Sequence, residues 1–129
     1  MSQGKHPTFG NGKICYLEIP AQDVQVSSEF YRNVFGWHIR ADHQGHVTFD
    51  DGVMEVSGMW VLDRKPVSDP GIVISIMVDD AGATMELING HGGQVINTQK
   101  MDSGEEIATF IDPAGNLMGI YQSSRSNQG

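Results

Sequence analysis

The chain has 129 residues, of which 39% are hydrophobic, and a formal net charge of −8 at pH 7. This length and hydrophobic content suit one compact core, whereas eight Lys and Arg residues in total argue against nucleic-acid or membrane-surface partners. No apolar run is long enough to span a bilayer or to serve as a signal peptide, so we expect a cytoplasmic protein.

The first predicted element is a strand at residues 15–19. Cys15, Leu17 and Ile19 alternate there with Tyr16 and Glu18, which is the period of a strand with one apolar face. Cys15 is the only cysteine, so no intrachain disulfide can form, and we expect it to be a buried, unreactive thiol. Tyr16 and Glu18 then point to the opposite face of the sheet.

A helix and three further strands complete the first half. Asp23 is a suitable N-cap for the helix, and Gly36 is a suitable residue to end it. The strands are expected at residues 37–41, 47–49 and 54–62. The second half repeats this order, with its helix capped by Asp79 or Asp80 and ending at Gly92-Gly93. Its strands are expected at residues 72–78, 94–98, 107–111 and 117–122.

The two halves can also be aligned with each other position by position. Asp23 lies over Asp80 with an offset of 57 (80 − 23 = 57), and Gly36 over Gly93 and Ile39 over Ile96 follow the same offset. GMW from Gly58 lies over GIY from Gly119 with an offset of 61 (119 − 58 = 61). We therefore predict one α+β domain at residues 13–122 that consists of two tandem βαβββ modules. They occupy residues 13–62 and 72–122, with a linker at 63–71 and flexible tails at 1–12 and 123–129.

One helix covers only one face of a four-stranded sheet, so each module leaves its other face bare. Two modules can cover those faces by joining into one curved mixed sheet, or cup. Strand positions that alternate away from the helices would line this cup and form the ligand pocket. They are Tyr16, Glu18, Gly58, Trp60, Val73, Ser75, Gly119 and Tyr121.

The strings EIPAQD, SSEFYRNVFGW, VDD and DPAGNLMGIYQ, in this tandem order, resemble the vicinal oxygen chelate superfamily. That superfamily includes glyoxalase I, extradiol dioxygenases, fosfomycin-resistance enzymes and bleomycin-binding proteins. The resemblance implies a glyoxalase-like cup, a homodimer, and a divalent metal bound by residues of the first and last strand of each module. The corresponding positions here are Tyr16, Gly58, Val73 and Gly119. None is a usual ligand of such a metal, so we expect no metal and no other cofactor.

A metal could still bind at an atypical site, away from the four positions that the resemblance implies. His38, His43 and His46 cluster in one predicted hairpin, but their spacing matches no zinc signature. We interpret them as a solvated, histidine-rich turn, and whether they bind a metal stays open.

An aromatic cup without metal suits an aromatic or cationic organic molecule, which predicts small-molecule binding of the bleomycin-resistance type. One alternative is a glyoxalase-like lyase or isomerase, or a dioxygenase-type enzyme, that uses Glu18 or Tyr16 as acid or base. The pKa of Glu18 would be raised in an apolar cup. The other alternative is a non-catalytic scaffold whose cup is filled by side chains. Unpaired outer strands also favour a homodimer.

Overall fold

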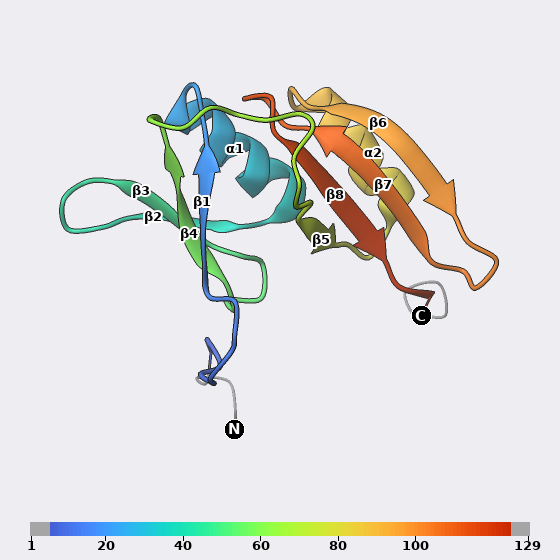
Figure 1. Cartoon of the computed structure of the whole chain (residues 1–129), viewed down its shortest axis with the longest axis horizontal. Helices are drawn as coiled ribbons and strands as arrows, with labels where there is room; N and C mark the ends of the chain where they lie inside the picture. Colours follow the sequence, from blue (N-terminus) through green and yellow to red (C-terminus); the bar gives the residue numbers. More distant parts are fainter. Residues whose placement is uncertain (1–5, 125–129) are drawn as a thin grey trace. The chain divides into compact units, whose positions relative to one another are not determined.

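The computed structural model of the chain describes residues 6–124, which form two compact units that divide between Lys65 and Pro66. Unit 1 contains β1 (Tyr16–Pro20), α1 (Val24–Phe35), β2 (His38–Ala41), β3 (Val47–Asp50) and β4 (Ser57–Val61). Unit 2 contains β5 (Ser75–Met77), α2 (Ala81–Gly90), β6 (Gln94–Lys100), β7 (Glu106–Ile111) and β8 (Leu117–Gln122) (Figure 1). The predicted α+β class and the tandem βαβββ order are confirmed, and the division lies inside the predicted linker.

Both units have the same sheet topology. The strand order is β1-β4-β3-β2 in unit 1 and β5-β8-β7-β6 in unit 2. In each sheet the first strand runs parallel to the last strand, and the other neighbours are antiparallel. The predicted joining of the two sheets into one cup, and the homodimer, stay predictions. None of the helices described between residues 6 and 124 is long and apolar enough to cross a membrane.

The helices begin where the sequence indicates. The carboxylate of Asp23 accepts hydrogen bonds from the backbone N–H groups of Gln25 and Val26, and that of Asp80 accepts one from Ala83. Asp80, and not Asp79, is therefore the cap of α2. Gly36 ends α1 with φ of 73°, a left-handed conformation that glycine adopts without a steric penalty.

An aromatic cluster forms the core of unit 1. The ring of Trp37 stacks on Tyr31 of α1 at a centroid distance of 4.6 Å and on Phe49 of β3 at 4.5 Å. Trp60 of β4 lies 4.8 Å from Phe49. These rings hold α1 against one face of the sheet and leave the other face free of the helix.

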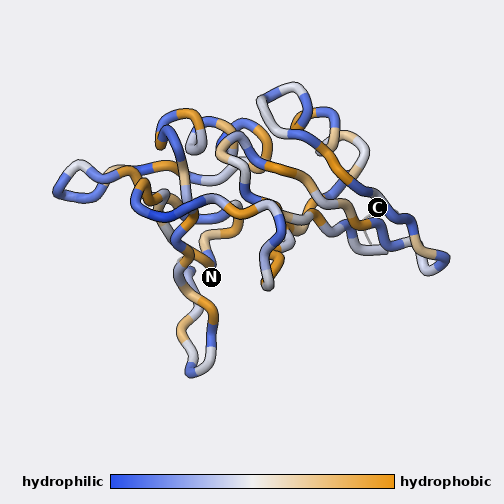
Figure 2. Tube along the Cα trace, turned by 45° about the horizontal axis from the view of Figure 1, so that its top comes forward, coloured by the Kyte–Doolittle hydropathy of each residue, from blue (hydrophilic) through white to orange (hydrophobic). Residues whose placement is uncertain are grey.

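The histidine-rich turn between β2 and β3 is hydrophilic at its tip (Figure 2). His43 and His46 are exposed, and the Nδ1 atom of His46 lies 3.3 Å from the carboxylate of Asp42. His38 lies on β2, outside this turn. This geometry agrees with the interpretation of a solvated turn.

Candidate functional site

We call the face of each sheet that points away from its helix the open face. On unit 1, Ile19, Phe49 and Trp60 are buried on the helix side, so the residues that alternate with them belong to the open face. The open face of unit 1 carries Tyr16, Glu18, His38, Arg40, Thr48, Asp50, Ser57 and Met59. The open face of unit 2 carries Ser75, Met77, Ile107, Thr109, Gly119 and Tyr121.

Gly58 and Trp60 do not lie on the open face, and the sequence prediction for these two residues is wrong. Gly58 is level with Leu17, and Trp60 is level with Ile19, in the parallel ladder between β4 and β1. Trp60 is only 2% exposed, and its ring lies 6.0 Å from that of Tyr31 in α1. Trp60 is therefore a core residue of unit 1 and is not available to a ligand.

The error comes from a slip of one residue between the repeats. Thr48 pairs with Met59 in unit 1, and its counterpart Thr109 pairs with Gly119 in unit 2. Met59, and not Gly58, is therefore the counterpart of Gly119, with an offset of 60 (119 − 59 = 60). A shift of one residue moves every side chain of a strand to the other face. The alignment of GMW with GIY therefore assigned the residues of β4 to the wrong faces of the sheet.

The corrected positions do not fit a divalent metal. They are Tyr16 and Met59 in unit 1, and Val73 and Gly119 in unit 2. Valine and glycine side chains have no donor atom, and the methionine thioether is a soft ligand. Between residues 6 and 124, no group of three or more His, Cys, Asp or Glu residues is placed to hold a metal ion.

A polar network joins strands β2, β3 and β4 on the open face of unit 1. Arg40 donates from Nε to Asp50 Oδ2 at 2.7 Å and from Nη2 to Oδ1 at 3.1 Å. The hydroxyl of Ser57 donates to the same Oδ1 at 2.6 Å. The hydrogen bonds from Arg40 hold the pKa of the Asp50 carboxyl below its usual range, with help from Ser57 and from the charges of Arg40 and His38 and against the effect of burial. Sequence reasoning missed Arg40 and Asp50, because only the register of β2, β3 and β4 brings them together.

Tyr16 and Glu18 both lie on this open face, but Glu18 is not surrounded by apolar side chains. Its Oε1 atom lies 2.5 Å from Nη2 of Arg64, and its side chain is 38% exposed. The expectation that Glu18 faces an apolar environment is therefore not met within unit 1.

The open face of unit 2 is less polar. Tyr121 lies level with Ile107 on one side and with Met77 on the other, and its hydroxyl donates to Glu105 Oε2 at 2.6 Å. This hydrogen bond raises the pKa of Tyr121 above its usual value of 10.0, and burial and the charge of Glu105 act in the same direction. The ring is thus fixed at its hydroxyl end by the loop between β6 and β7.

Three other predicted pocket residues belong to unit 2. Gly119 is buried next to Ser75, whose side chain occupies the space over it: a Cβ atom at Gly119 would lie 2.7 Å from the Ser75 hydroxyl oxygen. Val73 is exposed and precedes β5 by two residues. The structure thus brings Ser75, Gly119 and Tyr121 together on one face.

A separate cavity of about 240 Å³ lies beside the N-terminal end of β1. Its walls include Pro7, Phe9, Lys13, Cys15 and Glu55. Cys15 is exposed here, so the prediction of a buried thiol is wrong. The reason is that β1 begins only at Tyr16, so Cys15 lies outside the strand, whose apolar face packs on the helix.

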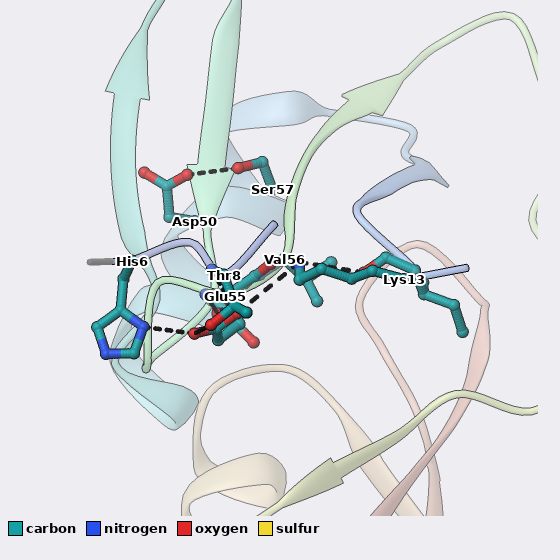
Figure 3. Close-up of polar contacts among 9 residues, drawn as sticks. His6, Thr8, Lys13, Asp50, Glu55, Val56 and Ser57 are labelled. Atoms are coloured by element: carbon teal, nitrogen blue, oxygen red, sulfur yellow. Dashed lines mark hydrogen bonds and ion pairs between the residues drawn. The ribbon is translucent and has the colours of Figure 1, made fainter. Parts of the chain in front are cut away.

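Glu55 anchors the N-terminal segment (residues 6–13) to the turn between β3 and β4 (Figure 3). Its carboxylate accepts hydrogen bonds from the backbone N–H and the hydroxyl of Thr8, both at 3.0 Å, and contacts Nδ1 of His6. Lys13 donates to the backbone carbonyl of Glu55. The polar groups around this cavity therefore bind one another.

Acid is expected to detach the N-terminal segment from Glu55. The hydrogen bond from the Thr8 N–H, followed by those from His6 and the Thr8 hydroxyl, lowers the pKa of Glu55 below its usual 4.5. A depressed pKa means that this stabilisation is present above pH 4.5 and is lost as the pH falls through the folded pKa. The Thr8 amide signal in NMR spectra should shift with that titration.

Two variants control this measurement. Glu55→Gln removes the titrating group and should abolish the acid-dependent shift of the Thr8 signal. Glu29→Gln changes an exposed carboxylate on α1, whose partner is Gln25, and should leave the shift as in the wild type. A Thr8 signal that titrates identically in Glu55→Gln contradicts the assignment.

The sequence matches the profile of the glyoxalase-like domain family over residues 16–121. A glyoxylase-like domain-containing protein of Didymella fabae is 30% identical over 95 residues, which cover 67% of this chain and 73% of that protein. An anthracycline biosynthesis protein of Streptomyces peucetius, DnrV, is 26% identical in an alignment 132 residues long that covers 88% of this chain and 48% of that protein. The chain thus spans about half the length of the Streptomyces relative.

The fold is also similar to that of solved structures. A member of the glyoxalase/bleomycin resistance protein/dioxygenase superfamily from Sphaerobacter thermophilus aligns with a TM-score of 0.70 and 21% identity. The alignment covers 87% of this chain and 98% of that one. At this identity the likeness concerns the fold alone.

Proposed function

The chain belongs to the glyoxalase-like domain family, and we propose that it binds a small aromatic molecule on the open faces of its sheets, without a metal. The observation that supports this most directly is the chemistry of the corrected ligand positions. Val73 and Gly119 offer no donor atom, and Met59 offers only a thioether. These side chains do not provide the ligands that a Lewis-acid reaction on a divalent metal requires.

The open face of unit 2 has the character of an aromatic binding surface. Met77 is 72% exposed although it lies in a strand, and its neighbour Tyr121 presents an aromatic ring that Glu105 fixes. A planar apolar ligand would cover the exposed thioether and stack on a ring that Glu105 already orients, which favours binding.

The Streptomyces peucetius relative supports the same ligand class. Its name refers to anthracycline biosynthesis, and anthracyclines are planar, polycyclic aromatic compounds. We extend this chemistry to the present chain as part of the proposal. The alternative of acid or base catalysis by Glu18 gains no comparable support, because Glu18 is paired with Arg64.

Titration of the purified protein with anthraquinone-2-carboxamide, a neutral planar probe, tests the proposal. We expect saturable binding by calorimetry, and Tyr121→Ala should weaken it about tenfold or more, because stacking on an aromatic ring is lost. Phe9→Ala is the matched control, since Phe9 is an exposed aromatic residue that lies outside both open faces. It should leave the affinity unchanged.

Two results would contradict the proposal. One is the absence of saturable binding of the probe by the folded wild-type protein. The other is a stoichiometric transition metal in elemental analysis of the purified protein, because it would show that the chain holds a metal despite its donor set.

A further inference from the structure

We propose that the Arg40 guanidinium binds the carboxylate of an aromatic acid on the open face of unit 1. This inference rests on the proposed function and adds the chemical class of the ligand. It starts from the network of Arg40, Asp50 and Ser57, which neither the family resemblance nor the comparisons assign.

The sheet register arranges the open face of unit 1 in two rows that cross the strands. The first row contains His38, Asp50, Ser57 and Tyr16, and the second contains Arg40, Thr48, Met59 and Glu18. Arg40 therefore stands at one end of its row, on edge strand β2, and its side chain turns toward Asp50 in the neighbouring row. Glu18 stands at the other end, about 14 Å away across three strand spacings.

Asp50 orients the guanidinium of Arg40 and leaves part of it available. The bonds to Asp50 use Nε and one hydrogen of Nη2. In the described part of the chain, the Nη1 amino group and the second hydrogen of Nη2 have no hydrogen-bond partner, and the side chain is 55% exposed. These free N–H groups form a second planar fork, whose geometry matches the two oxygens of a carboxylate.

Ser57 strengthens this orientation. Its hydroxyl donates to Asp50 Oδ1, the same oxygen that accepts from Arg40 Nη2, so the carboxylate is held from two neighbouring strands. Asp50 itself is nearly buried, with 12% of its side chain exposed. A guanidinium whose partner is fixed in this way loses less conformational entropy on binding a ligand than a free arginine does.

The side chains next to Arg40 in its row of the open face are uncharged. Thr48 lies next to it on β3, and Met59 follows on β4. A methionine thioether makes favourable contacts with aromatic rings. A planar ring can therefore lie over Met59 while its carboxylate reaches Arg40, which points to an aromatic acid and not to an aliphatic one.

A purely structural ion pair is the competing explanation, and the two make different predictions. Arg40 is half-exposed but Asp50 is nearly buried, so the loss of Arg40 should lower the melting temperature under either explanation, and stability does not separate the two. Only a binding role makes the affinity depend on the charge of the ligand. The experiment therefore compares anthraquinone-2-carboxylate with anthraquinone-2-carboxamide, which share the ring system and differ in charge.

We expect the wild-type protein to bind the carboxylate about tenfold tighter than the carboxamide, because charge-assisted hydrogen bonds are stronger than neutral ones. Arg40→Gln should remove this preference and leave the affinity for the carboxamide unchanged. Arg40→Lys should keep only part of the preference, since it keeps the charge and loses the planar fork. It also serves as the test should Arg40→Gln fail to fold.

Arg64→Gln is the matched control. The side chain of Arg64 is also 55% exposed and is also paired with a carboxylate, that of Glu18, so the two arginines differ mainly in position. The preference for the carboxylate should survive in this variant. The assignment would be overturned if Arg64→Gln lost the preference for the carboxylate and Arg40→Gln kept it.

The remaining outcomes separate this inference from the proposed function. Equal affinity of the wild-type protein for both probes would overturn the role of Arg40, while binding on the open faces would stand. Binding of neither probe would overturn both.

Discussion

Replacing Trp60 by alanine is expected to lower the free energy of unfolding by about 3–5 kcal/mol. Trp60 is buried among the rings of Tyr31, Trp37 and Phe49, so its removal leaves a large cavity between α1 and the sheet. Chemical denaturation followed by far-ultraviolet circular dichroism measures the change. A loss of this size approaches the whole stability of many small domains.

Tyr16→Ala is the control for this prediction. Tyr16 is an aromatic residue of the same sheet, but it is 49% exposed on the open face, so its loss should cost less than about 1 kcal/mol. Equal effects of the two substitutions would contradict the assignment of Trp60 to the core. Such a result would instead support the sequence prediction that placed Gly58 and Trp60 on the open face.

Trp60→Phe separates packing from hydrogen bonding at the same position. The indole Nε1 of Trp60 is buried and has no hydrogen-bond partner in the described part of the chain. Phenylalanine keeps an aromatic ring and removes this unsatisfied donor, which offsets part of the cavity cost. We therefore expect a clearly smaller loss than for alanine.

Gly58→Ala is expected to destabilise the protein by about 3 kcal/mol, at the upper end of the usual cost of overpacking. An added Cβ atom would lie 2.3 Å from the carbonyl oxygen of Leu17 and 2.4 Å from the ring of Phe49. The first is a backbone atom of the paired strand β1, so rotation of a side chain cannot relieve the clash. Thermal unfolding measures the loss.

Gly10→Ala is the matched control for Gly58→Ala. No atom lies within 4 Å of a Cβ atom built at Gly10, and its φ is not positive. Its substitution should therefore change the stability by less than about 0.5 kcal/mol. A Gly58→Ala variant as stable as Gly10→Ala would show that β4 does not pack against β1 and Phe49 as described.

Both substitutions concern the helix side of the sheet, yet they also bear on function. Trp60 and Gly58 fix which residues of β4 point to the other face, and these are Ser57 and Met59. Ser57 supports Asp50 beneath Arg40, and Met59 lies in the same row as Arg40. The core of unit 1 thus decides the chemistry of its open face.

The order of helices and strands could be predicted without coordinates, because the signals for it are local. Asp23 caps a helix by reaching N–H groups two and three residues ahead, and Gly36 ends it because it adopts a left-handed conformation. The alternation of Leu17 and Ile19 with Tyr16 and Glu18 likewise identifies a strand and its two faces. Such patterns depend on neighbouring residues, so the repeated order of elements was readable before any contact was known.

The side of β4 that faces the helix, and the polar residues that meet on the open face, became known from the strand pairing. The strings GMW and GIY are similar, but the register places Met59, and not Gly58, opposite Thr48. Arg40, Asp50 and Ser57 come from three strands and form one network only once those strands are paired. Side chains in a strand alternate between the two faces with a period of two residues. A slip of one residue, which is too small to detect in a sequence alignment, therefore exchanges core and surface.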